Sequence, residues 1–126
     1  MSVQGVAIQL WACNVLQPDL LSTPFFDAAA LAAFDVPVEL YFTARSVELL
    51  KPGVAEALFS GPQRNKSVYA YMQEAAQHGA KFYACTDAVR VYGLEGQPLI
   101  PEYTAPGGVV QFAARLLDAR WRCLVF

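Results

Sequence analysis

The stretch HGAKFYACTDAVRVYGL, residues 78–94, contains one strand-to-helix unit and decides the class of fold. Gly79 stands directly after a helical segment, where a helix commonly ends in a left-handed residue. The apolar run that follows, residues 80–86, has the composition of a buried strand, and a short helical run covers residues 87–94. The stretch therefore predicts a strand that leads straight into a helix, with Cys85 at the junction.

The rest of the chain repeats this alternation. The expected strands are rich in β-branched and aromatic residues, and lie at residues 6–14, 36–44, 80–86, 99–103 and 120–126. The expected helices lie at residues 25–34, 46–59 (with a break at 52–53), 66–77, 87–94 and 108–119. Strands that alternate with helices predict βαβ units, in which helices cover both faces of a mostly parallel sheet. We expect a single α/β domain over residues 1–126, a three-layer α/β/α sandwich with a sheet of about five strands.

Composition limits the classes of function. Hydrophobic residues make up 56% of the chain and charged residues 16%, which indicates strands covered on both faces, a buried subunit interface, or both. The formal net charge is -2 and the basic residues are not clustered, which argues against a nucleic-acid partner. The apolar runs are shorter than the roughly 20 residues of a membrane-spanning helix. A secretory signal requires basic residues near its start, and no basic residue precedes Arg45. We therefore expect a cytoplasmic protein without a membrane partner.

The three cysteines, Cys13, Cys85 and Cys123, are widely spaced and form neither a CxxC pair nor a disulfide framework. The one histidine, His78, stands at an expected helix end, so a metal site built from neighbouring ligands is not expected. The segment GPQRNKS at residues 61–67 resembles a phosphate loop only in its Lys-Ser ending, because the second glycine is missing and a helix precedes it. We expect reduced thiols, no metal and no cofactor.

Chemically capable side chains gather where the expected strands end. In parallel α/β sheets the functional groups collect at the carboxyl ends of the strands. The candidates at these ends are Cys13 and Asn14, Thr43 and Arg45, and Cys85 and Thr86. If the first and third strands are neighbours, Cys13 and Cys85 face one crevice, but the residues alone do not determine the strand order.

Position alone leaves two interpretations of Cys85. In the first, Cys85 is a working thiol, because the free N–H groups and dipole of the following helix favour a thiolate. Thr86 is placed to cap that helix. Asp87 opposes the thiolate with its own negative charge, and Arg90 or Arg45 offsets Asp87. In the second interpretation Cys85 is an inert core residue, because free cysteine is among the most buried residue types.

Three further residues have structural explanations. A loop rather than a helix follows Cys13, which favours a structural role for this residue. Cys123 lies in mid-strand on the same face as Trp121 and is expected in the core. Glu39 is the only carboxylate inside an apolar strand. We expect Glu39 to mark the sheet edge or a subunit contact, because a strand covered on both faces would have to pair it.

Three segments, in the same order, resemble the DsrE/DsrF-like family. VELYFTARSVELLKPG (residues 38–53) is similar to that family's second strand and following turn. HGAKFYACTDAVRVYGL (residues 78–94) resembles its Gly-Val-Lys-Ile-Tyr-Ala-Cys strand and the short helix after it. PGGVVQFAARLLDARWRCLVF (residues 106–126) resembles its closing helix and strand, whereas the loop at residues 15–24 departs from the compact turn usual there.

The resemblance implies a flavodoxin-like sheet and assembly into a homo-oligomer, a trimer or hexamer. It also implies that Cys85 carries sulfane sulfur as a persulfide, as in a sulfur carrier or sulfurtransferase that works between donor and acceptor proteins. Two other functions stay open. One is a non-catalytic ligand-binding or scaffold protein of the same fold, and the other is a thiol redox protein in which Cys13 resolves Cys85.

Overall fold

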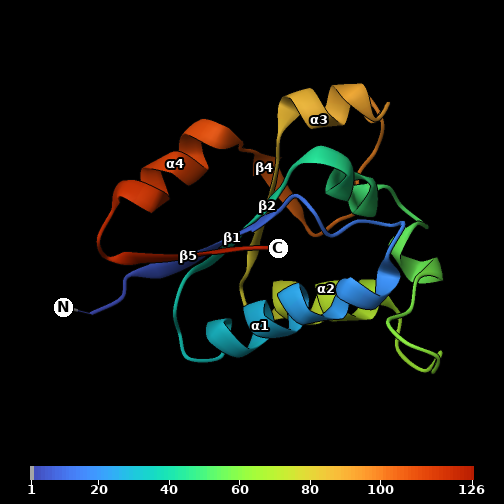
Figure 1. Ribbon diagram of the computed structural model, residues 1–126, viewed down its shortest axis with the longest axis horizontal. Helices are drawn as coiled ribbons and strands as arrows, with labels where there is room; N and C mark the ends of the chain where they lie inside the picture. Colours follow the sequence, from blue (N-terminus) through green and yellow to red (C-terminus); the bar gives the residue numbers. More distant parts are fainter. Residues whose placement is uncertain (1) are drawn as a thin grey trace.

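The structure, a computed structural model, describes residues 2–126 and has three layers (Figure 1). Its sheet has five strands in the order β4-β3-β2-β1-β5, and every neighbouring pair is parallel. The strands are β1 (Gly5–Leu10), β2 (Val38–Phe42), β3 (Lys81–Ala84), β4 (Tyr103–Pro106) and β5 (Trp121–Val125). The predicted three-layer α/β/α sandwich with a parallel sheet of about five strands is confirmed.

The helices surround this sheet. The α-helices are α1 (Ser22–Ala32), α2 (Val68–Gln77), α3 (Thr86–Val91) and α4 (Val109–Leu117). Short 3₁₀ helices are η1 (Pro18–Leu20), η2 (Ala44–Leu50) and η3 (Ala55–Ala57), and the last two occupy the region expected as one broken helix. Figure 1 shows α1 and α2 together on one face of the sheet and α4 on the other, while α3 contacts η2.

The strand order places β2 between β1 and β3, so the first and third strands are not neighbours. Flavodoxin itself has the order 2-1-3-4-5, and the present order differs from it although the layers are the same. The register pairs Phe42 with both Leu10 and Ala84, so the three central strands end level with one another. The residues that follow these strands therefore start from the same edge of the sheet.

The fourth strand lies a few residues later than the extended piece expected at residues 99–103. Ile100 is buried, and its N–H donates to the carbonyl oxygen of Leu50 at 2.9 Å. The apolar residues that predicted a strand here therefore serve a contact between this loop and η2 instead. β4 itself is a half-exposed edge strand, and such strands carry a weak apolar signal.

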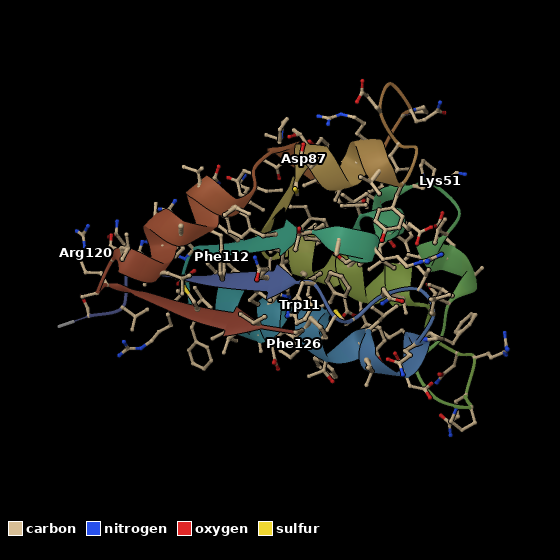
Figure 2. All side chains as sticks on the ribbon, turned by 45° about the horizontal axis from the view of Figure 1, so that its top comes forward. Trp11, Lys51, Asp87, Phe112, Arg120 and Phe126 are labelled. Carbon is tan, nitrogen blue, oxygen red and sulfur yellow. The ribbon has the colours of Figure 1, made fainter. Side chains whose placement is uncertain are left out.

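The main core fills the layer between the sheet and the α1–α2 face. The rings of Phe25, Phe42 and Phe82 lie there with centroids 5.4–6.2 Å apart. The layer under α4 holds a much smaller cluster, made of Ala7, Tyr41, Phe112 and Trp121. Figure 2 shows Phe112 pointing from α4 towards the sheet. Phe112 is the one buried residue of this helix.

Glu39 corrects an expectation. β2 is a central strand, so Glu39 does not mark a sheet edge, and its partner lies within the same chain. Nε and Nη2 of Arg115 on α4 donate to the two carboxylate oxygens of Glu39, each at 2.8 Å. The sheet-edge part of the expectation was wrong, because this covered strand pairs its carboxylate with a basic residue far away in the sequence.

Cys123 also differs from its expected place in the core. β5 is an edge strand, so Cys123 is only half-buried and packs against the small cluster under α4. Its neighbours Leu124 and Val125 are exposed. The alternating pattern located the strand correctly, but an edge strand lacks the cover that would bury both of its faces.

Candidate functional site

Backbone contacts hold Cys85 at the point where β3 becomes α3. Its N–H donates to the carbonyl oxygen of Phe42 at 2.9 Å, which ties it to β2. Its own carbonyl oxygen accepts from Val89 N–H at 3.0 Å, which starts α3. Cys85 itself occupies the N-cap position of α3, and its side chain makes no capping hydrogen bond. Thr86 is the first residue of the helix. The expected cap at Thr86 is thus wrong, because the chain turns into the helix one residue earlier.

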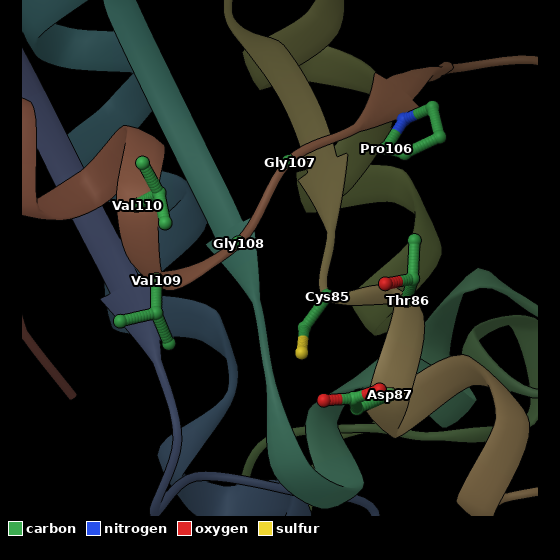
Figure 3. A pocket seen from close by; sticks show the side chains of 8 residues that line it. All are labelled: Cys85, Thr86, Asp87, Pro106, Gly107, Gly108, Val109 and Val110. Carbon is green, nitrogen blue, oxygen red and sulfur yellow. The ribbon is translucent and has the colours of Figure 1, made fainter.

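The Cys85 side chain lines an open pocket of about 370 Å³. Residues 85–87 form one side of the pocket, and residues 106–110, where β4 passes into α4, form the other. Figure 3 shows the sulfur pointing into the space between Asp87 and the start of α4. Cys85 is half-buried, so its thiol combines a fixed backbone with access from solvent.

Two glycines bring α4 close to the cysteine. A Cβ atom on Gly107 would stand 3.0 Å from Cβ of Tyr83, closer than ordinary van der Waals contact. A Cβ atom on Gly108 would lie 3.8 Å from Sγ of Cys85. The absence of side chains at these positions lets the first turn of α4 approach the sheet and leaves free space beside the sulfur.

Of the two arginines expected to offset Asp87, Arg90 pairs with it. Nη2 of Arg90 lies 3.2 Å from Oδ1 of Asp87, and Nε of Arg90 lies 3.3 Å from Oε2 of Glu95. All three side chains are exposed, so solvent weakens both ion pairs. Arg90 nevertheless offsets the carboxylate that lines the pocket. On the opposite wall, the free N–H groups at the start of α4 carry partial positive charge.

Thr43, Arg45 and Asn14 stand near the same edge of the sheet but do not line the Cys85 pocket. The Thr43 N–H donates to the carbonyl oxygen of Leu10. The Arg45 guanidinium pairs with Glu48 at 2.7 Å and lies over the ring of Tyr92. The Asn14 side chain bonds to backbone atoms of its own loop. Of the crevice candidates, only Thr86 lines the pocket with Cys85. Arg90 lies outside it and reaches it only through its ion pair with Asp87.

Cys13 belongs to the main core rather than to the pocket. It is buried, and the loss of solvent raises the pKa of its thiol to about 11. Its thiol is therefore neutral and weakly nucleophilic near neutral pH. β2 lies between the strands that precede Cys13 and Cys85, so the two cysteines do not end adjacent strands.

The far wall of the pocket was not predicted from the sequence. The residues of this wall, 106–110, drew attention only as the start of a helix. The pair Gly107–Gly108 was the available signal, since adjacent glycines before a helix often mark a close approach of the backbone to another group. A second pocket of about 290 Å³ shares Thr86 and Pro106 with the first. Its lining combines apolar side chains, among them Val89 and Leu94, with the charged pair Arg90 and Glu95.

Two features are absent from residues 2–126. This part of the chain holds no cluster of three or more histidine, cysteine or acidic side chains suited to a metal ion. Over the same residues, no helix combines the length and the apolar character needed to cross a membrane.

The fold and the pocket define a class: small, parallel three-layer α/β proteins with a half-exposed cysteine where a central strand enters a helix. The sequence profile of the DsrE/DsrF-like family matches residues 20–126, and the chain belongs to this family. No curated protein sequence shows a significant match.

Two solved structures are similar to this chain. The YchN protein from E. coli superposes with a TM-score of 0.77 at 17% identity, over 98% of this chain and 100% of that protein. MTH1491 from Methanobacterium thermoautotrophicum, described as a protein of unknown function, superposes with a TM-score of 0.64 at 17% identity. That match covers 96% of this chain and 97% of MTH1491. At this identity the likeness concerns the fold.

Proposed function

We propose that this protein is a sulfur carrier that holds sulfane sulfur as a persulfide on Cys85. The observation that carries the proposal is the half-exposed Cys85 sulfur in an open pocket, in a chain of the DsrE/DsrF-like family. A sulfur carrier needs a thiol that is fixed in place yet reachable by a donor and an acceptor. A cysteine without free space beside its sulfur would not support this function.

The chemistry is a thiol–persulfide exchange without net oxidation. The Cys85 thiolate attacks the outer sulfur of a donor persulfide, so that a new S–S bond forms on Cys85. The S–S bond of the donor breaks, and the donor leaves as a thiolate. In the second half of the cycle an acceptor thiolate attacks the outer sulfur, and Cys85 leaves as the thiolate. One sulfur atom moves in each step, and the electrons balance.

The walls of the pocket suit this exchange. The bare backbone of Gly108 leaves room beside the Cys85 sulfur for one additional sulfur atom. The free N–H groups of the first turn of α4 favour the negative charge of a thiolate or persulfide anion. Asp87 disfavours that charge, and its ion pair with Arg90 reduces this effect.

The outer surface of α4 supports assembly into a homo-oligomer, a trimer or hexamer. Val110 and Leu117 are 86% and 89% exposed, and Val109 and Leu116 are exposed as well. Val125 of the neighbouring strand β5 is also exposed, on the face that Trp121 and Cys123 share. We call these five residues the α4–β5 apolar surface. Exposed apolar side chains grouped in this way mark interaction sites in soluble proteins. Val109 and Val110 also line the Cys85 pocket, so a second copy on this surface would border the pocket.

A reducing compartment suits such a carrier, because it keeps the thiols free of disulfides. The proposal accordingly includes a cytoplasmic location and exchange of sulfur with donor and acceptor proteins.

The test is intact-mass spectrometry after incubation with a low-molecular-weight persulfide donor. The expected result is a gain of one sulfur atom that is lost on treatment with a reductant and absent in Cys85→Ser. Cys123→Ser is the matched control, because Cys123 is the other half-buried cysteine, and this variant is expected to load like the wild type. A sulfur gain that persists in Cys85→Ser, or no gain in any variant, contradicts the proposal.

The second pocket favours one alternative function. Its lining joins apolar side chains with the Arg90–Glu95 pair, and its volume of about 290 Å³ is near the lower end of known ligand pockets, so it suits a small, mostly apolar ligand. A protein that only binds such a ligand would show no sulfur loading and would gain thermal stability with the ligand. The redox alternative would require Cys13 to reach Cys85 past β2, and a Cys13–Cys85 disulfide after mild oxidation would support it.

A further inference from the structure

Four polar side chains form a connected network between the sheet and α4. Arg115 donates two hydrogen bonds to Glu39, and the Tyr41 hydroxyl donates a third to Glu39 at 2.6 Å. Nε2 of Gln111 donates to the Tyr41 hydroxyl oxygen at 2.9 Å. The Arg115 guanidinium also lies 3.9 Å from the centre of the Trp121 ring. We call Glu39, Tyr41, Gln111 and Arg115 the β2–α4 network.

The network reverses the usual orientation of an amphipathic helix. A surface helix normally turns its apolar stripe to the core and its polar residues to water. In α4 the polar side chains of Gln111 and Arg115 bond to the sheet, while Val110 and Leu117 face outward. The small cluster around Phe112 offers few apolar contacts to fix the helix in place. Directional hydrogen bonds to two side chains one turn apart fix both the rotation of α4 and its position along the sheet.

The network reaches the wall of the Cys85 pocket at Gln111. Oε1 of Gln111 would stand 3.0 Å from a Cβ atom on Gly107, so this side chain packs directly against the backbone before α4. The next residue, Gly108, is the one that lies against the Cys85 sulfur. A displacement of Gln111 therefore moves the segment that borders the sulfur. Tyr41 transmits the position of the sheet to this segment, because its hydroxyl joins Gln111 to Glu39.

We propose that the β2–α4 network positions the first turn of α4 as the wall of the Cys85 pocket and so limits the size of the group that reaches the Cys85 sulfur. Tyr41 and Gln111 are positioning residues, since neither one lines the pocket. The biological role of the pocket rests on the proposed function. The positioning of its wall is tested separately, on the free Cys85 thiol. In a sulfur carrier, this wall would admit a persulfide and hinder bulkier thiol reagents.

The test compares two thiol reagents of different size, iodoacetamide and a bulky N-aryl maleimide, on wild type, Tyr41→Phe, Gln111→Met and the double variant. The rate at Cys85 is followed by mass mapping of its peptide, at a temperature far below unfolding. Both single variants are expected to raise the ratio of the bulky to the small reagent's rate several-fold. The double variant is expected to match the single variants, because both changes break the same hydrogen bond.

Tyr83→Phe is the matched control. The Tyr83 ring is stacked on Tyr41 at 5.4 Å and also borders Gly107, but the described part of the chain shows no hydrogen bond from its hydroxyl group. This control is expected to leave the ratio unchanged. A merely structural role would lower the unfolding temperature without moving the ratio of the two rates. An unchanged ratio in both folded single variants, or an equal change in Tyr83→Phe, overturns the proposal.

The outcome is separable from that of the proposed function. If the ratio changes but wild type gains no sulfur from a persulfide donor, the positioning role stands and the carrier function fails. If wild type loads sulfur and the ratio does not respond to Tyr41→Phe or Gln111→Met, the carrier function stands and the network has no role in the pocket.

Discussion

Glu39 and Arg115 are 76 positions apart in the chain, and they meet through two N–O contacts of 2.8 Å in the middle of the sheet. Glu39 is buried on a central strand, and the hydrogen bonds to it raise the pKa of Arg115 above its usual value. The pair connects the strand next to β3 with the helix whose first turn borders Cys85. The position of the candidate site thus depends on an interaction between distant parts of the sequence.

Replacement of Arg115 by methionine is expected to lower the free energy of unfolding by about 3 kcal/mol, because it leaves the Glu39 carboxylate buried without its partner. Chemical denaturation followed by circular dichroism measures this change. The control is Arg120→Met, since the Arg120–Asp118 pair has similar N–O distances but is exposed to solvent. Equal stabilities of the two variants would show that solvent, rather than Arg115, compensates the Glu39 charge.

Gly108→Leu is expected to slow the alkylation of Cys85 several-fold. A Cβ atom at this position would already stand 3.8 Å from the sulfur, so the branches of a leucine side chain occupy the space that a reagent or a sulfur atom needs. Gly108→Ala is the control, because its Cβ atom makes only ordinary van der Waals contact. The measurement is the rate of iodoacetamide labelling at Cys85. Equal rates in the leucine variant and the wild type would mean that reagents reach the sulfur from another side.

Much of the fold was predictable from local patterns. The apolar runs located β1, β2 and β3, because buried parallel strands are almost continuously hydrophobic. The edge strand β5 was located by its alternating pattern. β4 was placed a few residues too early, because an edge strand shows little of this pattern and the apolar Ile100 serves another contact. Periodicity located α4, but it did not show that most of the apolar side chains of this helix face outward.

The candidate site was predictable only in part. The strand-to-helix junction singled out Cys85 together with Thr86 and Arg90, since these residues are close in the sequence. The opposite wall at residues 106–110 comes from a different βα junction, and only the strand order brings β4 beside β3. The contact between Glu39 and Arg115 depends on the strand order as well. Long-range pairing of this kind leaves no local signal in a single sequence.

Leu117→Asp is expected to reduce the oligomeric state in solution. Leu117 is 89% exposed within the α4–β5 apolar surface, and a carboxylate there would be buried without a partner in an assembly. Sedimentation velocity measures the change in mass. Leu20→Asp is the control, because Leu20 is half-exposed on η1, outside this surface. An unchanged assembly in Leu117→Asp, with loss of assembly in Leu20→Asp, would move the interface to the η1 side of the molecule.

The buried Cys13 thiol is expected to make the free energy of unfolding depend on pH in the alkaline range. Burial raises the pKa of its thiol to about 11, whereas the thiol of an unfolded chain has a pKa of about 8.5. A group whose pKa is raised on folding contributes stability that is complete below the unfolded pKa and is lost as the pH rises towards the folded pKa. The free energy of unfolding is therefore expected to fall by on the order of 1–2 kcal/mol between about pH 8.5 and pH 10.

The measurement is urea denaturation at several pH values within this window. Tyrosines of the unfolded chain begin to ionise near its upper end, so the share of Cys13 is obtained by comparison with a variant that lacks this thiol. Cys13→Ala is expected to flatten the pH dependence although it lowers the stability overall, because it removes the titrating thiol together with some core packing. Cys123→Ala is the control. Burial also raises the pKa of Cys123, but this residue is only half-buried, so a smaller change in slope is expected. A slope that stays the same in Cys13→Ala would show that Cys13 reaches solvent and ionises in the folded protein, which would also revive it as a partner for Cys85.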